Sequence, residues 1–258
     1  MTELKSLYRS LGLMSTRGQT GICEDLTRRP SVLAKCFAKA LSENSILPPI
    51  DQPFLPTNAD EVRRTIGPED RNDNRIYFRL RAGDRVVVPG SPGEYAFEVV
   101  ARQVPPRREA GNGKPYSGRG GIDYVGIAGT SPVLGEIKLC GDQNPFYAFI
   151  QLLAYLSEMA TEPQVERARK YLFGERSIGP CPTYDLHIVL ADFNDRGLKG
   201  GLISATERLV KGLRAELRQR DPHAGGCLGN IICMMLTTGL AAGAEGDHME
   251  LRWFDPKP

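Results

Sequence analysis

The segment 183–193, TYDLHIVLADF, constrains the fold of this 258-residue chain more than any other. Its apolar run is typical of a strand that is buried on both faces of a sheet. A second run of this kind, GNIICMMLTTG, covers 229–239, and the segment 204–220 between them has the apolar spacing of a helix. His187, inside the first run, is expected to be a hydrogen-bonded histidine of the sheet. These patterns predict an α/β protein with three layers around one central mixed sheet.

Other segments also show the period of a helix or a strand. Prolines and cap residues predict helix starts at Pro30, Asn144, Thr161 and Ser204. The remaining predicted helices are 4–11, 30–44, 145–160 and 162–174, and the remaining predicted strands are a hairpin over 75–90, a strand over 94–105, two strands within 121–139 and an edge strand over 248–256. We expect a single domain over 1–258, with an insertion or subdomain at 45–92.

Composition excludes several classes of protein. Hydrophobic residues make up 41% and charged residues 25% of the chain, which argues against disordered and fibrous classes. The first 20 residues lack the apolar region of a signal peptide, and the longest apolar run, FIQLLAYL, is too short to span a bilayer. The six cysteines form no C-x-x-C pair, so reduced thiols are expected instead of a zinc or iron–sulfur site. A cytoplasmic protein without a membrane partner is therefore expected.

Basic residues are concentrated in one Gly/Pro-rich segment, although the formal net charge is only +2. A run of charge is about as often a solvated surface as a binding site. This segment leads directly into the strands of 121–139, which makes it a candidate for contacts with phosphates. Its basic residues are Arg102, Arg107, Arg108, Lys114 and Arg119.

Three charged residues lie in the two strands predicted within 121–139. Glu136 and Lys138 are two residues apart, so their side chains project to the same face of a strand. Asp123 faces Glu136 across an antiparallel pair if the turn falls between 128 and 132. Mg²⁺ and Mn²⁺ prefer oxygen ligands, and the backbone carbonyl of Ile137 adds a third oxygen near the two carboxylates. The pattern predicts a cation site, with Lys138 able to orient a water or to stabilise charge on a phosphate.

The helix predicted after these strands carries a polar row. Tyr147, Gln151 and Tyr155 are spaced four residues apart, so they share one face of the helix. Two tyrosines and a glutamine beside a cation site suit contacts with a phosphate or a base.

The segment GGIDYVGIAG…VLGEIKL resembles the paired-strand signature of the PD-(D/E)XK, or restriction-endonuclease-like, nuclease superfamily. Asp123 matches the Asp of that signature, Glu136 and Lys138 match its Glu-x-Lys, and Ile122 stands where the signature has Pro. The resemblance covers about 93–193. It implies a restriction-endonuclease-like αβββαβ core with extra strands.

Two further features belong to this resemblance. Gln151 and Tyr155 match the Q-x-x-x-Y pair of the RecB-type branch, which lies beside the active site and helps to hold the nucleic-acid backbone. The superfamily also has a helix before the core, often with an acid that assists metal binding. Glu24 and Glu43 are both candidates for that acid.

Together these features predict a Mg²⁺- or Mn²⁺-dependent nuclease that hydrolyses phosphodiester bonds, with DNA as the first expected substrate and RNA as the alternative. Asp123 and Glu136 would hold the cation, and Lys138 would assist the attacking water. The polar row of the helix and the basic segment would position the strand. Two alternatives remain open: a catalytically silent module of the same fold that binds nucleic acid or protein, and an unrelated α/β enzyme. A homodimer also remains open, because double-strand cutting by such a site usually requires two copies.

Overall fold

The computed structural model describes residues 2–51, 53–54, 85–87, 95–106, 121–138, 144–191, 198–237 and 248–255. Most of the hairpin predicted over 75–90 and of the insertion predicted at 45–92 lies outside these residues. The predicted phosphate-contacting residues Arg107, Arg108, Lys114 and Arg119 lie outside them as well.

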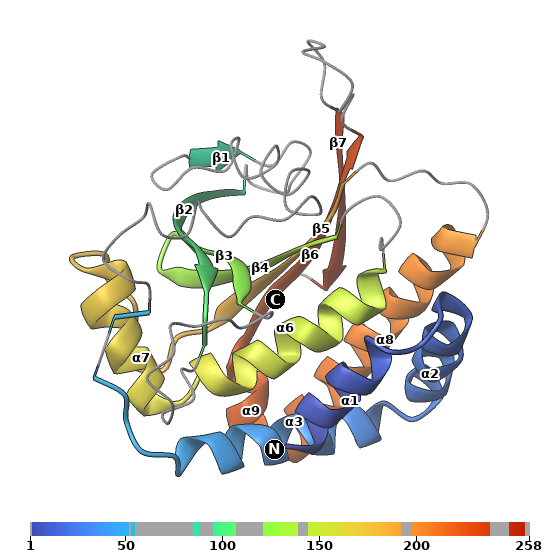
Figure 1. Ribbon diagram of the computed structural model, residues 1–258, viewed down its shortest axis with the longest axis horizontal. Coiled ribbons are helices and arrows are strands. Elements are labelled where there is room, and N and C mark those ends of the chain that lie inside the picture. Colours follow the sequence, from blue (N-terminus) through green and yellow to red (C-terminus); the bar gives the residue numbers. More distant parts are fainter. Residues whose placement is uncertain are drawn as a thin grey trace.

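Seven strands in the described part of the chain form one mixed sheet, and each strand pairs with its neighbours in the sequence (Figure 1). β4, β5 and β6 are parallel, and every other neighbouring pair is antiparallel. The α/β class and the mixed sheet expected from the sequence are thus confirmed. The strands are β1 (Arg85–Val87), β2 (Ala96–Val104), β3 (Ile122–Ala128), β4 (Ser131–Lys138), β5 (Tyr184–Ala191), β6 (Leu228–Thr237) and β7 (His248–Asp255).

The helices alternate with the strands in the second half of the chain and precede them in the first. The helices are α1 (Glu3–Leu11), α2 (Thr16–Arg28), α3 (Pro30–Ser45), α6 (Pro145–Met159), α7 (Glu162–Ala168), its π-helical continuation η1 (Arg169–Phe173), α8 (Leu198–Arg220) and α9 (Pro222–Gly226). None of the described helices has the length and apolar character needed to cross a bilayer.

The helices cover one face of the sheet in two layers. α6 lies between β4 and β5 in the chain and α8 between β5 and β6, and both connections step across the sheet in the same direction. Connections between parallel strands are right-handed, so both helices lie on the same face. α1, α2 and α3 pack on α6 and α8 as an outer layer (Figure 1). Within the described residues the layers are therefore sheet, helix and helix, and a central sheet enclosed between helices, as predicted, is not seen there.

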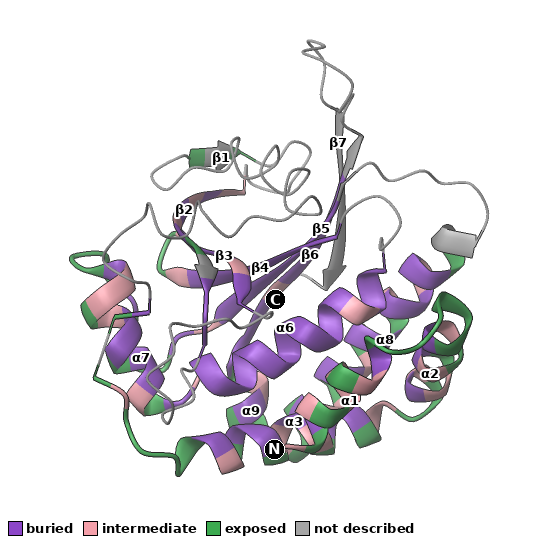
Figure 2. Cartoon of the chain, viewed as in Figure 1, coloured by how far each residue is buried: buried purple, intermediate pink, exposed green. Residues whose placement is uncertain are grey.

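α6 forms the centre of the helical layers. It is buried along nearly its whole length (Figure 2), because the sheet covers one side while α1 and α3 cover the other. A helix that is apolar around most of its surface requires such an environment. Its start is the predicted one: Asn144 Oδ1 accepts the Tyr147 N–H at 3.1 Å, and Pro145 occupies the first helical position.

Two other predictions about helix starts need correction. α8 begins at Leu198, so Ser204 lies inside the helix and does not cap it. The buried side chains of Leu202 and Ile203 extend the packed surface of the helix toward its amino terminus. Thr161 precedes α7 as predicted, but its hydroxyl donates to the Glu158 carbonyl at 3.1 Å instead of capping the helix.

His187 lies on the face of the sheet opposite α6 and is hydrogen-bonded, as predicted. Tyr124 Oη lies 2.9 Å from its Nδ1, and Tyr95 Oη lies 2.9 Å from its Nε2. Tyr95 donates to Asp185 Oδ2 at 2.7 Å, so the proton between Tyr95 and His187 belongs to Nε2. Complete burial lowers the pKa of His187 to about 3. The histidine is therefore neutral at neutral pH and part of a buried polar chain.

Gly135 permits this arrangement. A Cβ added at Gly135 would lie 2.1 Å from the Tyr124 ring, so only glycine lets the ring cross β4 toward His187. Tyr124 and Gly135 are cross-strand partners, and their neighbours on each strand face the opposite way.

Candidate active site

The β3–β4 hairpin places Asp123 and Glu136 on the face that α6 covers. Tyr124 pairs with Gly135 on the opposite face, so the next residues along the two strands, Asp123 and Glu136, are neighbours on the helical face. The Ile137 N–H donates to Asp123 Oδ2 at 2.7 Å, which ties the carboxylate to β4. The N–H and C=O of one residue project to the same side of a strand, so the Ile137 carbonyl also points toward β3.

Lys138 joins this hairpin to α6. Its ammonium donates to Glu136 Oε1 at 2.9 Å and to Gln151 Oε1 at 3.0 Å. The same nitrogen lies 4.7 Å from the centroid of the Tyr147 ring, which is within range of a cation–π contact. Glu136 is 3% exposed and Lys138 is 8% exposed. A buried ion pair needs such additional partners, because both charges lose most of their hydration.

The polar row on α6 continues this network. Gln151 Nε2 donates to Tyr155 Oη at 3.1 Å, so Glu136, Lys138, Gln151 and Tyr155 form one hydrogen-bonded chain. Burial raises the pKa of Tyr155 well above its usual value, and the charges of Glu136 and Asp123 raise it further. Both carboxylates therefore lie within electrostatic range of the same hydroxyl. The structure brings the predicted residues of β3, β4 and α6 into one cluster.

Three residues beside this cluster were not predicted from the sequence. Tyr8 on α1 stacks on Tyr147 with ring centroids 5.5 Å apart. The Gln19 amide donates to the Leu11 carbonyl at 2.8 Å and accepts a hydrogen bond from Asn144, which ties α2 to the start of α6. Gly12 ends α1 next to the Tyr147 hydroxyl. The i, i+4 spacing of Leu4 and Tyr8 was the available signal for Tyr8, because it places both on one side of the predicted first helix.

The cluster has oxygen donors that suit Mg²⁺ or Mn²⁺. Mg²⁺ in proteins is usually bound by one or two carboxylates, with waters and substrate phosphate oxygens completing the shell. Asp123 and Glu136 provide two carboxylates, and each can accept several partners in addition to the bonds given above. Within the described ranges, no group of three or more His, Cys, Asp or Glu side chains is arranged to hold a metal. The residues present therefore fit a cation shared with a phosphate, and do not fit an all-protein metal cage.

The two candidates for the acid of a preceding helix, Glu24 and Glu43, lie on α2 and α3. Glu43 lies 3.9 Å from Lys39 on the same helix. Glu24 is exposed on α2.

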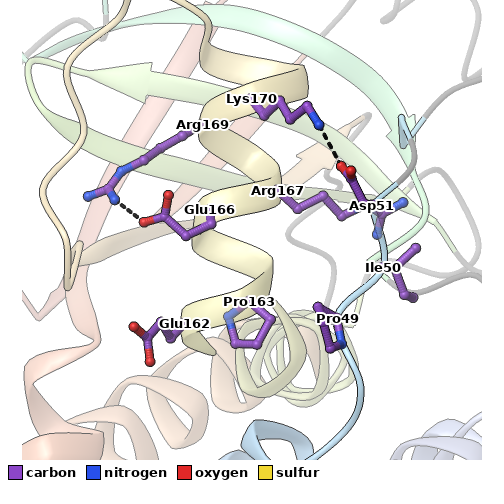
Figure 3. A pocket seen from close by; sticks show the side chains of 9 residues that line it. All are labelled: Pro49, Ile50, Asp51, Glu162, Pro163, Glu166, Arg167, Arg169 and Lys170. Carbon is purple, nitrogen blue, oxygen red and sulfur yellow. Dashed lines mark hydrogen bonds and ion pairs between the residues drawn. The ribbon is translucent and has the colours of Figure 1, made fainter.

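A separate cavity of about 640 Å³ lies between the connection after α3 and α7 (Figure 3). Four of its charged lining residues form two ion pairs: Lys170 contacts Asp51 at 2.7 Å, and Arg169 pairs with Glu166. None of its lining residues belongs to the cluster around Lys138. The cavity is therefore not part of the candidate active site.

Comparisons of the chain with models of protein families, with curated proteins and with solved structures found no match. Conclusions about function therefore depend on the geometry of the cluster around Lys138.

Proposed function

We propose that this protein is a Mg²⁺- or Mn²⁺-dependent nuclease that hydrolyses phosphodiester bonds in DNA. The observation that carries the proposal is the position of the Lys138 ammonium, which is held by Glu136 and Gln151 on the face that also bears Asp123. Two carboxylates and a directed ammonium can support metal-assisted hydrolysis of a phosphodiester, because they provide ligands for a cation and a donor for the water or the phosphate.

Each residue has a role in this reaction. Asp123, Glu136 and the Ile137 carbonyl would hold the cation. When bound, the cation would polarise a phosphoryl oxygen and lower the pKa of a coordinated water. Lys138 would donate a hydrogen bond to the attacking water or to a non-bridging phosphate oxygen, while Glu136 and Gln151 fix the direction of its ammonium. The water oxygen forms the new bond to phosphorus and loses a proton to solvent, while the bond between phosphorus and the sugar oxygen breaks and that oxygen takes up a proton from solvent.

The order of elements supports the same proposal. β2, β3, β4, α6 and β5 occur in the order of the strand–strand–strand–helix–strand part of a restriction-endonuclease-like core, with α7 and η1 inserted between α6 and β5. Asp123 lies on its second strand, Glu136 and Lys138 on its third, and Gln151 and Tyr155 on the following helix, as in the RecB-type pattern. In this proposal Gln151, Tyr155 and Tyr147 contact the strand, and Arg107, Arg108, Lys114 and Arg119 contact its phosphates.

The proposal is tested by a cleavage panel of single-stranded, duplex and branched DNA and of RNA, each with Mg²⁺ and with Mn²⁺. We expect cleavage of at least one DNA form by the parent and by Lys170→Gln, since Lys170 is an exposed lysine that pairs with Asp51 and does not belong to the cluster. Lys138→Gln and Asp123→Asn should lose at least 100-fold in rate, a typical loss when one group that stabilises developing charge is removed. Cleavage by Lys138→Gln at the parental rate would refute the proposal.

Cation binding separates the nuclease from a catalytically silent module. Titration calorimetry should show Mn²⁺ binding to the parent and weaker binding to Asp123→Asn. A parent that binds DNA but neither binds Mn²⁺ nor cuts any substrate would be such a module.

A further inference from the structure

Tyr8 reaches the candidate active site from the outer helical layer. Its ring stacks on Tyr147, with centroids 5.5 Å apart and planes inclined by 21°. It also meets the edge of Tyr155, with centroids 6.3 Å apart. Tyr147 is the ring beside the Lys138 ammonium, so one aromatic contact separates Tyr8 from that lysine.

The position of Tyr8 is set by the docking of α1. Leu4 and Leu11, which lie on either side of it in the helix, are completely buried. Lys5 forms an ion pair with Glu158 of α6 at 3.0 Å, which fixes α1 along the helix that carries Tyr147. The Tyr8 ring is therefore held against Tyr147 by contacts on both sides of it.

Tyr8 contributes a neutral ring to the cluster. Burial raises the pKa of its hydroxyl above the usual range, Tyr147 and the charge of Glu136 raise it further, and Lys138 lowers it. The hydroxyl therefore lies within electrostatic range of both Glu136 and Lys138, and it stays protonated at neutral pH. Tyr8 therefore acts on Tyr147 through ring stacking and carries no charge itself.

We propose that Tyr8 is a positioning residue for Lys138. Its stacking holds the Tyr147 ring beside the ammonium, and this keeps the ammonium directed at Glu136 and Gln151. The consequence for catalysis rests on the proposed nuclease function, whereas the positioning of Lys138 can be measured without any activity.

Three variants test the proposal. Tyr8→Phe keeps the ring, and Tyr8→Leu removes it. Gly12→Ala acts on the same contact from outside: the new Cβ would lie 2.8 Å from the Tyr147 hydroxyl and displace it, while the helical φ of −62° at Gly12 is compatible with alanine. Tyr171→Leu, which removes a tyrosine bonded to Asp51, is the matched control.

The first readout is the rate at which acetic anhydride acylates Lys138, measured by peptide mass spectrometry relative to the half-exposed Lys39. We expect an increase of about fivefold in Tyr8→Leu and an increase in Gly12→Ala, in line with the loss of one cation–π contact, and parental rates in Tyr8→Phe and Tyr171→Leu. Gly12→Ala should retain the parental Tm, so it remains informative if Tyr8→Leu does not fold. Parental acylation of Lys138 in a folded Tyr8→Leu would overturn the proposal, and so would parental acylation in Gly12→Ala, where the Tyr147 ring is displaced.

The second readout is steady-state cleavage. Tyr8→Leu should lower kcat about fivefold with KM unchanged, and Tyr8→Phe should restore kcat. A raised KM with unchanged kcat would instead make Tyr8 a substrate contact and overturn its role in positioning Lys138. If acylation changes as expected but the parent cuts no nucleic acid, the proposed function fails while the positioning of Lys138 by Tyr8 stands.

Discussion

Protonation of His187 should destabilise this protein at mildly acidic pH. The folded state lowers the pKa of His187 from 6.5 to about 3, because the ring is completely buried. Between these values the unfolded chain binds a proton that the folded protein excludes. The stability that His187 contributes is therefore fully present above pH 6.5 and is lost progressively as the pH falls from 6.5 toward 3.

The size of the effect follows from this shift. Each unit of pKa difference corresponds to about 1.4 kcal/mol, so the free energy of unfolding should fall by about 2 kcal/mol between pH 7.5 and pH 5 through this residue alone. A loss of ~2 kcal/mol is a large part of the 5–15 kcal/mol that stabilises a typical domain. Solvent does not weaken this effect, because the His187 ring is 0% exposed.

Urea unfolding followed by circular dichroism at pH 7.5, 6.5, 5.5 and 5.0 measures this loss. His187→Gln keeps a polar side chain between Tyr95 and Tyr124 but cannot titrate, so the difference between the two pH dependences isolates His187 from the carboxylates. We expect the parent to lose about 2 kcal/mol more than the variant over this range. Equal losses in the two proteins would refute the reasoning. An NMR titration of the His187 ring in the parent provides the same test if the variant does not fold.

Further predictions concern the glycines and the polar chain of the site. Gly135→Ala forces the Tyr124 ring to move and should destabilise the protein by roughly 1–3 kcal/mol or more, measured by urea unfolding. Gly21→Ala, at an exposed α2 position with no atom within 4 Å of the new Cβ, should instead stabilise it by about 0.5–1 kcal/mol. Gln151→Leu leaves Lys138 with one acceptor fewer and should cost about 1–3 kcal/mol in the same assay, with a matching loss of any cleavage activity. A neutral effect of Gly135→Ala, or a stabilising effect of Gln151→Leu, would contradict these contacts.

The inner strands of the sheet were predictable because a buried strand has a run of apolar residues that is visible in the local sequence. β5 and β6 lie inside the sheet between other strands and carry nearly unbroken apolar runs. The two-residue period of a strand placed Glu136 and Lys138 on one face of β4, and the four-residue spacing in a helix placed Gln151 and Tyr155 on one face of α6. These rules depend only on neighbouring residues, so they can be applied without knowledge of the tertiary fold.

Features that depend on distant contacts were not predictable in this way. α2 was missed because its buried residues are only Gln19, Cys23 and Leu26, a stripe too weak to indicate a helix. The layer order seen in the described residues was not predicted, because it depends on the direction in which successive strands are added to the sheet, and the period of the apolar residues does not contain that information. The contact between Tyr8 and Tyr147 joins α1, which precedes β1–β4 in the chain, to α6, which follows them, and no local pattern specifies it.

The packing of α1 on α6 has a consequence for the order of events during synthesis. Lys5 and its partner Glu158 are 153 residues apart in the chain. At about 5–20 residues per second, α1 waits roughly 8–30 s for the helix on which it docks. The β3–β4 hairpin, with both carboxylates and Lys138, also leaves the ribosome before Gln151 and Tyr155. A nascent chain therefore carries the charged residues of the site without the surroundings that orient them, and the complete cluster can form only after α6 has emerged.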